Sequence, residues 1–134
     1  MALDLAITNL AAEAESGYEF ELLHPATGEH LGAWVKVRGE KSKTVQTHAR
    51  KIVTEMQKRE KVAKGKNKEI ELTIEDYEDM AVDRAIVRII SWRGIQENSQ
   101  DVPFNRENAE RILKEHPWIR EAVMEESDNL LNFR

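Results

Sequence analysis

Cysteine is absent from this chain of 134 residues, and aromatic residues make up only 6% of it. Without cysteine the chain forms no disulfide, thiolate zinc site or iron–sulfur cluster, and it has no cysteine nucleophile. Three Trp, three Phe and two Tyr residues leave little material for a deep cofactor cavity. A chain of this length builds one core, which buries roughly two-thirds of the surface of the unfolded chain. The composition therefore predicts a single domain.

Long hydrophobic runs are also absent. No apolar stretch approaches the roughly 20 residues that span a bilayer. The first residues, MALDLAITNLAAEAES, have neither a basic region nor a continuous apolar region of the kind that a signal peptide carries. We therefore expect a protein that neither spans a membrane nor is secreted.

Catalytic and metal-binding motifs are missing as well. The sequence has no phosphate-binding glycine-rich loop, no dinucleotide fingerprint and no nucleophile elbow. His24, His30, His48 and His116 do not have the spacing of helical metal ligands. The acidic residues between 75 and 83 fit the solvated start of a helix better than a pocket that raises one pKa. The sequence predicts no enzyme, no cofactor and no metal.

The N-terminal part combines one short helix with one hairpin. Leu3, Ile7, Leu10 and other apolar residues recur at helical spacing, which predicts an amphipathic helix within residues 1–17. From residue 18 to residue 38 the period changes to two around a central turn, which predicts a β-hairpin. Because two strands alone are marginally stable, one face of this hairpin must pack on helices or on another chain. Trp34 is the expected anchor of that face.

The rest of the chain, residues 42–134, is predicted to be helical. A basic helix runs from Ser42 to about Lys64 and is followed by a polar hinge near residues 64–70. Thr73 stands three residues before an acidic residue, an approximate capping box that opens a helix through Trp92. Apolar residues surround the second half of that helix, so we expect it to be the most buried one.

Gly, Asn and Pro residues are expected to mark the ends of the C-terminal helices. Gly94 is expected to end the preceding helix, with a loop from Gln96 to Pro103. Asn105 is suited to cap a helix that stops before Pro117, and this proline is suited to the first turn of the next helix. The predicted fold is α+β and predominantly α-helical: a short N-terminal helix, one β-hairpin and four to five helices in a single domain, residues 1–134.

Charge is strongly segregated although the whole chain has a net charge of only −5. Residues 41–68 hold ten Lys and Arg against two Glu, whereas residues 69–83 hold seven acidic residues and no basic one. One interpretation is a basic arm that binds nucleic acid or an acidic protein. The other is a solvated helix face that pairs with the acidic start of the following helix. The second is favoured because no aromatic residue interrupts the basic run to stack on bases.

The aromatic residues gather at the hairpin and in the C-terminal third. Large side chains next to Gly and Pro there either connect successive helices or form a recognition surface, because adjacent Trp and Arg residues are typical interface anchors. These two roles are not separable from the sequence. The candidate fold-defining or partner-binding residues are Trp34, Trp92, Arg93, Phe104, Trp118 and Ile119.

An ordered set of short motifs resembles a known family. The motifs are W-R-G-I at 92–95, V-P-F-N-R-E-N at 102–108, P-W-I-R-E-A-V at 117–123, N-F at 132–133 and P-A-T-G-E-H-L-G-A-W-V-K-V-R-G at 25–39. In this order they are similar to the tail assembly chaperones of long-tailed, lambdoid-type (non-contractile) bacteriophages and their prophage relatives. The basic helix and the acidic stretch after it carry none of these motifs.

The resemblance implies a helix-rich protein without enzymatic activity that works in the host cell cytoplasm and is absent from the mature virion. Its expected partners are the tape measure protein, which it binds and keeps soluble, and the tail tube protein. It is also expected to form homo-oligomers, with no membrane partner and no nucleic acid. The alternative function is a nucleic-acid-binding phage adaptor or regulator that uses the basic stretch 41–68.

In many such phages a programmed −1 frameshift makes a longer product, whose extension contacts the tube protein. Leu130-Leu131-Asn132 can be encoded as CUU-UUA-AAC, which contains the slippery sequence U-UUA-AAC. We hypothesise that the frameshift occurs at this tripeptide, which the codons of the gene decide.

Overall fold

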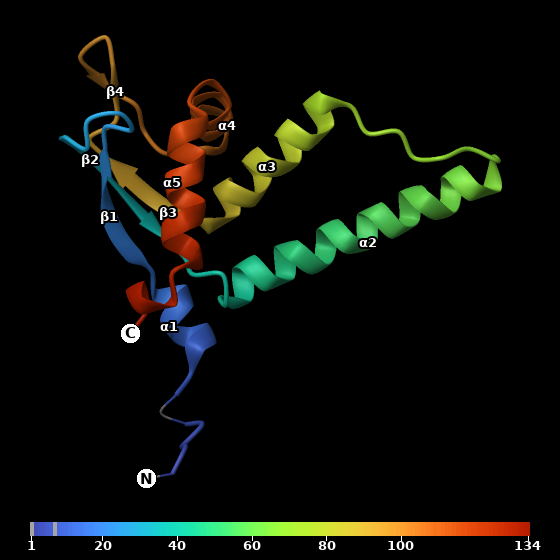
Figure 1. Cartoon of the computed structure of the whole chain (residues 1–134), viewed down its shortest axis with the longest axis horizontal. Coiled ribbons are helices and arrows are strands. Elements are labelled where there is room, and N and C mark those ends of the chain that lie inside the picture. The colour runs from blue at the N-terminus through green and yellow to red at the C-terminus, as the bar shows by residue number, and fades with distance from the viewer. Residues whose placement is uncertain (1, 7) are drawn as a thin grey trace.

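The computed structural model describes residues 2–6 and 8–134, and it shows a small antiparallel sheet with helices on one face and a two-helix arm that extends from it (Figure 1). This confirms the predicted α+β, mainly helical, single-domain class. None of the helices in the described residues is long and apolar enough to span a bilayer. In chain order the elements are α1 (Leu10–Ser16), β1 (Tyr18–Leu23), β2 (His30–Val37), α2 (Lys43–Gly65), α3 (Ile74–Arg88), β3 (Ile89–Arg93), β4 (Gln96–Glu97), β5 (Gln100–Asp101), α4 (Arg106–Glu115), α5 (Pro117–Asp128) and the 3₁₀ turn η1 (Leu130–Asn132).

Helix α1 is shorter than predicted. It begins at Leu10 because the side chain of Asn9 accepts a hydrogen bond from the Ala12 N–H at 3.0 Å, as an N-cap does. Leu3 is not helical and is 73% exposed, so the predicted helix over residues 1–17 is wrong in its first half. Ile7, which the prediction places on the apolar face, lies outside the described residues.

The predicted hairpin is confirmed, and it forms part of a sheet with strand order β1-β2-β3. Phe20 pairs with Val35, and Val35 pairs with Trp92, so all three side chains point to the helical face. Trp34 points to the opposite face. It is therefore not the anchor of the hairpin on the helices, because side chains alternate along a strand and the buried ones are its neighbours Ala33 and Val35.

The predicted helix through Trp92 is wrong in its last turn, where the chain passes directly from α3 into β3. Ile89 and Ile90 are β-branched, and pairing with β2 outweighs their continuation of the helix. The guanidinium of Arg38 donates hydrogen bonds to the carbonyls of Val87 (3.0 Å) and Ile89 (3.2 Å), which satisfies backbone groups at this junction.

Gly94 follows β3 rather than a helix. Its φ is +78°, and a Cβ at this position would lie 2.3 Å from the backbone oxygen of Gly32, so only glycine fits. The segment predicted as a loop from Gln96 to Pro103 contains the two short strands β4 and β5. This small hairpin projects beyond the main sheet (Figure 1).

The C-terminal helices begin where the sequence predicts. The Asn105 side chain accepts a hydrogen bond from the Asn108 N–H at 2.8 Å, and Pro117 occupies the first turn of α5. Helices α3, α4 and α5 pack on the sheet. The second half of α3 holds the buried residues of this helix, Val82, Ala85, Ile86 and Arg88, as expected. Their common core consists of Phe20, Leu22, Ala33, Val35, Val37, Val82, Ala85, Ile86, Ile89, Ala109, Ile112, Leu113, Ile119, Val123 and Phe133.

A buried polar cluster joins the ends of α3, β2 and α5. The Arg88 guanidinium, on a residue that is 6% exposed, donates to Ser127 Oγ (2.9 Å) and to the Asp128 carboxylate (2.7 Å). Ser127 Oγ in turn donates to the Arg38 carbonyl (2.6 Å), and the Arg38 N–H donates to the Arg88 carbonyl (2.6 Å). These hydrogen bonds connect the three elements, while the Arg88 Nε is buried without a hydrogen-bond partner among the described residues.

Replacing Ser127 by Ala should lower the free energy of unfolding by about 1–3 kcal/mol, because a buried guanidinium and a buried carbonyl each lose a partner. Urea unfolding monitored by circular dichroism measures this change. Ser91→Ala is the matched control: Ser91 is exposed on β3, and the change there should stay within about 0.5 kcal/mol. Equal effects of the two substitutions would contradict the structural role of Ser127.

Candidate functional site: the groove between α2 and α3

Helices α2 and α3 diverge from the body of the protein and are rejoined at their far ends by residues 66–73 (Figure 1). Ser42 caps α2, its side chain accepting from the Val45 N–H at 3.1 Å. The helix has 23 residues, which corresponds to ~34 Å at 1.5 Å per residue. Val45 in its first turn is its only buried residue. Most of this long helix is therefore held by one end.

The apolar stripe of α2 faces a groove along α3. Nearest the body the groove is lined by Val45 and Ala49 of α2 and Val87 of α3. Ile52 and Met80 line both this part and a wider part of about 450 Å³, which reaches Met56 and continues past Lys58 and Arg59 to Val62 and Ala63. Because neighbouring parts share lining residues, they form one continuous groove along most of α2, called here the interhelix groove.

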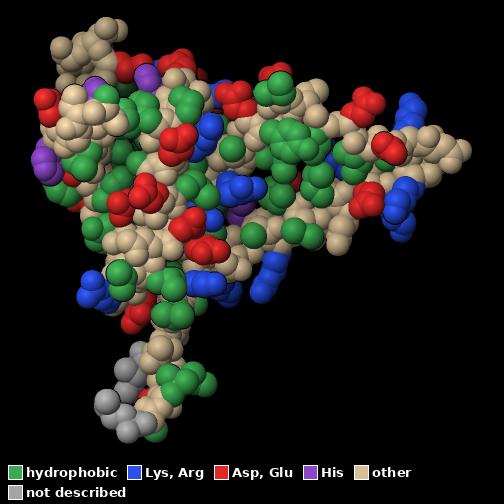
Figure 2. All heavy atoms as spheres, viewed as in Figure 1, with side chains coloured by type: hydrophobic (Ala, Val, Ile, Leu, Met, Phe, Trp, Pro, Cys, Tyr) green, Lys and Arg blue, Asp and Glu red, His purple; other side chains and the backbone are tan. Residues whose placement is uncertain are grey.

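Large apolar side chains around this groove are open to solvent. Val53 is 56% exposed and Val62 is 58% exposed on α2, while Tyr77 is 59% exposed and Ile74 is 87% exposed on α3. Figure 2 shows hydrophobic side chains gathered over α3 and a hollow between the two arm helices. Contiguous exposed apolar surface of this kind marks interaction sites in soluble proteins.

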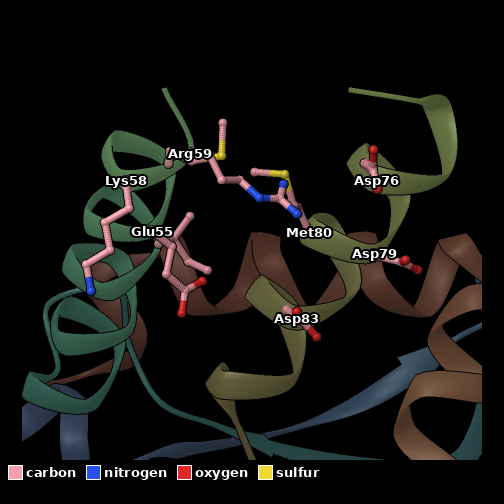
Figure 3. Close-up of a pocket in the computed structure, with 9 residues that line it drawn as sticks. Glu55, Lys58, Arg59, Asp76, Asp79, Met80 and Asp83 are labelled. Atoms are coloured by element: carbon pink, nitrogen blue, oxygen red, sulfur yellow. The ribbon is translucent and has the colours of Figure 1, made fainter. Parts of the chain in front are cut away.

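Acidic residues of α3 pair with α4 and not with α2. Asp79 forms an ion pair with Lys114 at 2.7 Å, and Asp83 forms one with Arg106. In Figure 3 both carboxylates point away from α2. The favoured interpretation of the charge pattern, direct pairing of the basic helix with the acidic start of the next, is thus wrong for the described residues: none of their ion pairs joins α2 to α3.

The basic residues are consequently free. Of the ten Lys and Arg side chains between 41 and 68, all of them in the described part of the chain, only Lys64 has a carboxylate within ion-pair distance, that of Glu60 at 3.3 Å. Figure 3 shows Arg59 reaching from α2 toward α3. The Thr73 N–H that donates to Asp76, together with the charge of Arg59, lowers the pKa of that carboxyl below its usual value. The capping box predicted at Thr73 is confirmed by the same hydrogen bond.

The six residues predicted as fold-defining or partner-binding lie outside the groove and in three different places. Trp92 packs edge-on against Phe104, with ring centroids 5.0 Å apart, and its Nε1 donates to the Val102 carbonyl at 2.7 Å. Arg93 stacks over Trp34 on the outer sheet face, 5.0 Å from the ring centroid. The last two residues, Trp118 and Ile119, line a hollow of about 360 Å³ beside the hairpin turn.

The apolar stripe of α2 can be read from the helical spacing of its residues in the sequence, but the groove cannot. The stripe consists of Val45, Ala49, Ile52, Val53, Met56 and Ala63. The difference in length between α2 and α3 indicates that part of α2 is unpaired, because the 15 residues of α3 cannot cover all 23 residues of α2. Met80 and Arg59, which complete the groove, carry no motif.

Comparison with known protein families gives a match. A sequence model described as YdaY prophage protein matches residues 40–134, which include α2, the groove and everything after them. No curated protein and no solved structure matches the chain. The match defines a protein of phage or prophage origin. The chain belongs to the YdaY prophage protein family.

His48 lines the inner part of the groove, and burial lowers its pKa below the usual value. Because the unfolded chain binds a proton more readily, stability is lost as the pH falls from about 6.5 through the lower pKa of the folded state. His48→Gln removes this titration. Its melting temperature should fall less than that of the wild type between about pH 7 and pH 5. Parallel curves from differential scanning calorimetry would contradict this.

Proposed function

We propose that this member of a prophage family is a tail assembly chaperone that binds and solubilises the tape measure protein in the host cytoplasm and helps to recruit tail tube subunits. The observation that carries the proposal is the interhelix groove, an open apolar surface along most of α2. A tape measure protein is a long, helix-rich chain with apolar stripes. A groove between two helices is the usual receptor for such a stripe.

The chemistry of the groove suits a partner that presents many different apolar segments. Two of the four methionines of the chain, Met56 and Met80, face each other across it. Methionine is unbranched and flexible, so it adapts to side chains of different shape, and it is frequent on promiscuous binding surfaces. Ile52 adds a rigid branched side chain beside them. A chaperone that coats a long chain needs this tolerance.

The charged exterior of the arm supports the same proposal. Lysines and arginines line the solvent side of α2, and Figure 2 shows them at the outer end of the arm. Like charges keep protein surfaces apart in solution, so a basic arm with an apolar inner face binds a partner without aggregating by itself. The ordered motifs described for the C-terminal third are a second, independent support for a tail assembly chaperone.

Met56→Asp should weaken binding to the tape measure protein of the same prophage by at least about tenfold, because a carboxylate would be buried against an apolar stripe. Co-expression followed by quantification of soluble tape measure protein, and titration of the purified complex, measure the effect. The melting temperature of the free variant should stay close to that of the wild type, since Met56 lies on the open arm.

Gln57→Asp is the matched control, because Gln57 is an exposed neighbour on α2 that does not line the groove. It should leave binding unchanged. Retention of full affinity by Met56→Asp would overturn the assignment of the groove. A tape measure protein that stays soluble without the chain would overturn the proposed function itself.

The second candidate function is nucleic-acid binding by the basic stretch 41–68. The unpaired cations favour it, above all Lys43, Arg50 and Lys61, whose spacings of 7 and 11 residues are close to two and three whole helical turns, so that they share one face of α2. Phosphate neutralisation by such a face releases condensed counterions.

A duplex DNA titration at two salt concentrations tests this candidate. If α2 binds phosphates through a few contacts, the affinity for DNA should fall at least about tenfold between 50 and 200 mM salt. In the triple variant Lys43→Ala, Arg50→Ala, Lys61→Ala, the affinity should depend less steeply on the salt concentration. Absence of affinity for both DNA and RNA at the lower salt concentration would eliminate the candidate.

A further inference from the structure

We infer that the helix received by the interhelix groove carries acidic residues beside its apolar stripe, positioned to pair with Arg59 and Arg84. The inference rests on the proposed function, because it names the chemistry of the partner of that same groove. It follows from which charges along the groove already have partners and which do not.

Most acidic side chains that line the groove already have a partner within the protein. Asp79 and Asp83 pair with Lys114 and Arg106 of α4, and Asp76 accepts a hydrogen bond from the Thr73 N–H at 3.0 Å. A basic residue on a bound helix would compete with these existing contacts. These carboxylates therefore offer an incoming cation little net gain.

Several basic side chains that line the groove have no carboxylate within ion-pair distance in the described part of the chain. Arg59 lines the middle of the groove and Arg84 lines its inner part, and among the described residues neither has a carboxylate within ion-pair distance. Lys58 and Lys68 add two more unpaired ammonium groups toward the outer end. Over the part of the chain that the structure describes, Glu55, Glu69 and Asp76 are the carboxylates of the lining without an ion-pair partner, so four unpaired cations face three unpaired carboxylates, and Asp76 is already held by the Thr73 N–H.

Arg59 and Arg84 differ from the other cations in their surroundings. Each stands next to apolar lining: Arg59 shares its part of the groove with Met56 and Met80, and Arg84 shares its part with Ile52 and Met80. A helix that covers these side chains would shield the two guanidinium groups from water, and shielding strengthens an ion pair. Arginine also binds a carboxylate through two parallel hydrogen bonds, which fixes the position of the bound helix.

Two synthetic helical peptides with the same Leu–Ala stripe test the inference, one with Glu and one with Lys at the positions that flank the stripe. Fluorescence anisotropy with the full chain should give an affinity for the Glu peptide roughly tenfold higher than for the Lys peptide. In the variant Arg59→Glu, Arg84→Glu this preference should be reversed. Both residues are exposed, so circular dichroism should show an unchanged fold.

The variant Arg50→Glu, Lys61→Glu is the matched control. It changes the net charge by the same amount at exposed positions of α2 that do not line the groove, so the preference for the Glu peptide should persist. Loss of the preference in this control would show that overall charge, not the groove, selects the peptide, and would overturn the inference.

The remaining outcomes separate the inference from the proposed function. Equal binding of both peptides to the wild type, abolished by Met56→Asp, would overturn the charge preference and leave the groove as a site for apolar helices. Binding of neither peptide would overturn both the charge preference and the assignment of the groove as a helix receptor.

Discussion

The buried guanidinium of Arg88 is the constraint on which the arrangement of this molecule depends. A buried charge is costly unless it is paired and hydrogen-bonded, and Arg88 finds its partners, Ser127 and Asp128, only where α5 ends. The Ser127 hydroxyl in turn donates a hydrogen bond to the Arg38 carbonyl, just after β2. One residue thereby joins the end of α3 to the end of α5 beside the sheet.

Because these contacts hold the body of the protein rigidly, the two arm helices α2 and α3 can leave the groove between them open. Because α3 is fixed at its C-terminal end and α2 at its N-terminal end, the two helices need not pack along their whole length to keep their positions. Glu15 contributes to the second anchor: it accepts from the Thr44 N–H at 2.7 Å and lies 3.3 Å from Arg38, contacts that lower its pKa. Stability is thus concentrated in the body, and the apolar lining of the arm is left uncovered, as binding surfaces often are.

Local signals predicted a large part of the fold. The caps at Asn105 and Thr73 and the proline at position 117 act through neighbouring backbone groups, so they are readable from sequence. Strand β3 could not be predicted from the sequence, because Ile89 and Ile90 become a strand only through pairing with β2. The ion pairs of Asp79 and Asp83 were assigned to the wrong helix for a related reason: their partners are 23 or more residues away, on α4. The groove itself depends on how far two helices diverge, which no local pattern encodes.

The segment 66–73 that rejoins the arm helices has a mechanical consequence. Fully extended, it reaches ~26 Å, so it limits how far the outer ends of α2 and α3 can separate. Two helices with a third inserted between them have axes ~16–20 Å apart, since each packed pair needs about 8–10 Å. The segment is thus long enough to allow one inserted helix between the outer ends of α2 and α3. Because it joins α2 and α3 at their far ends, the arm is a closed loop, and its outer ends can separate only as far as this segment extends.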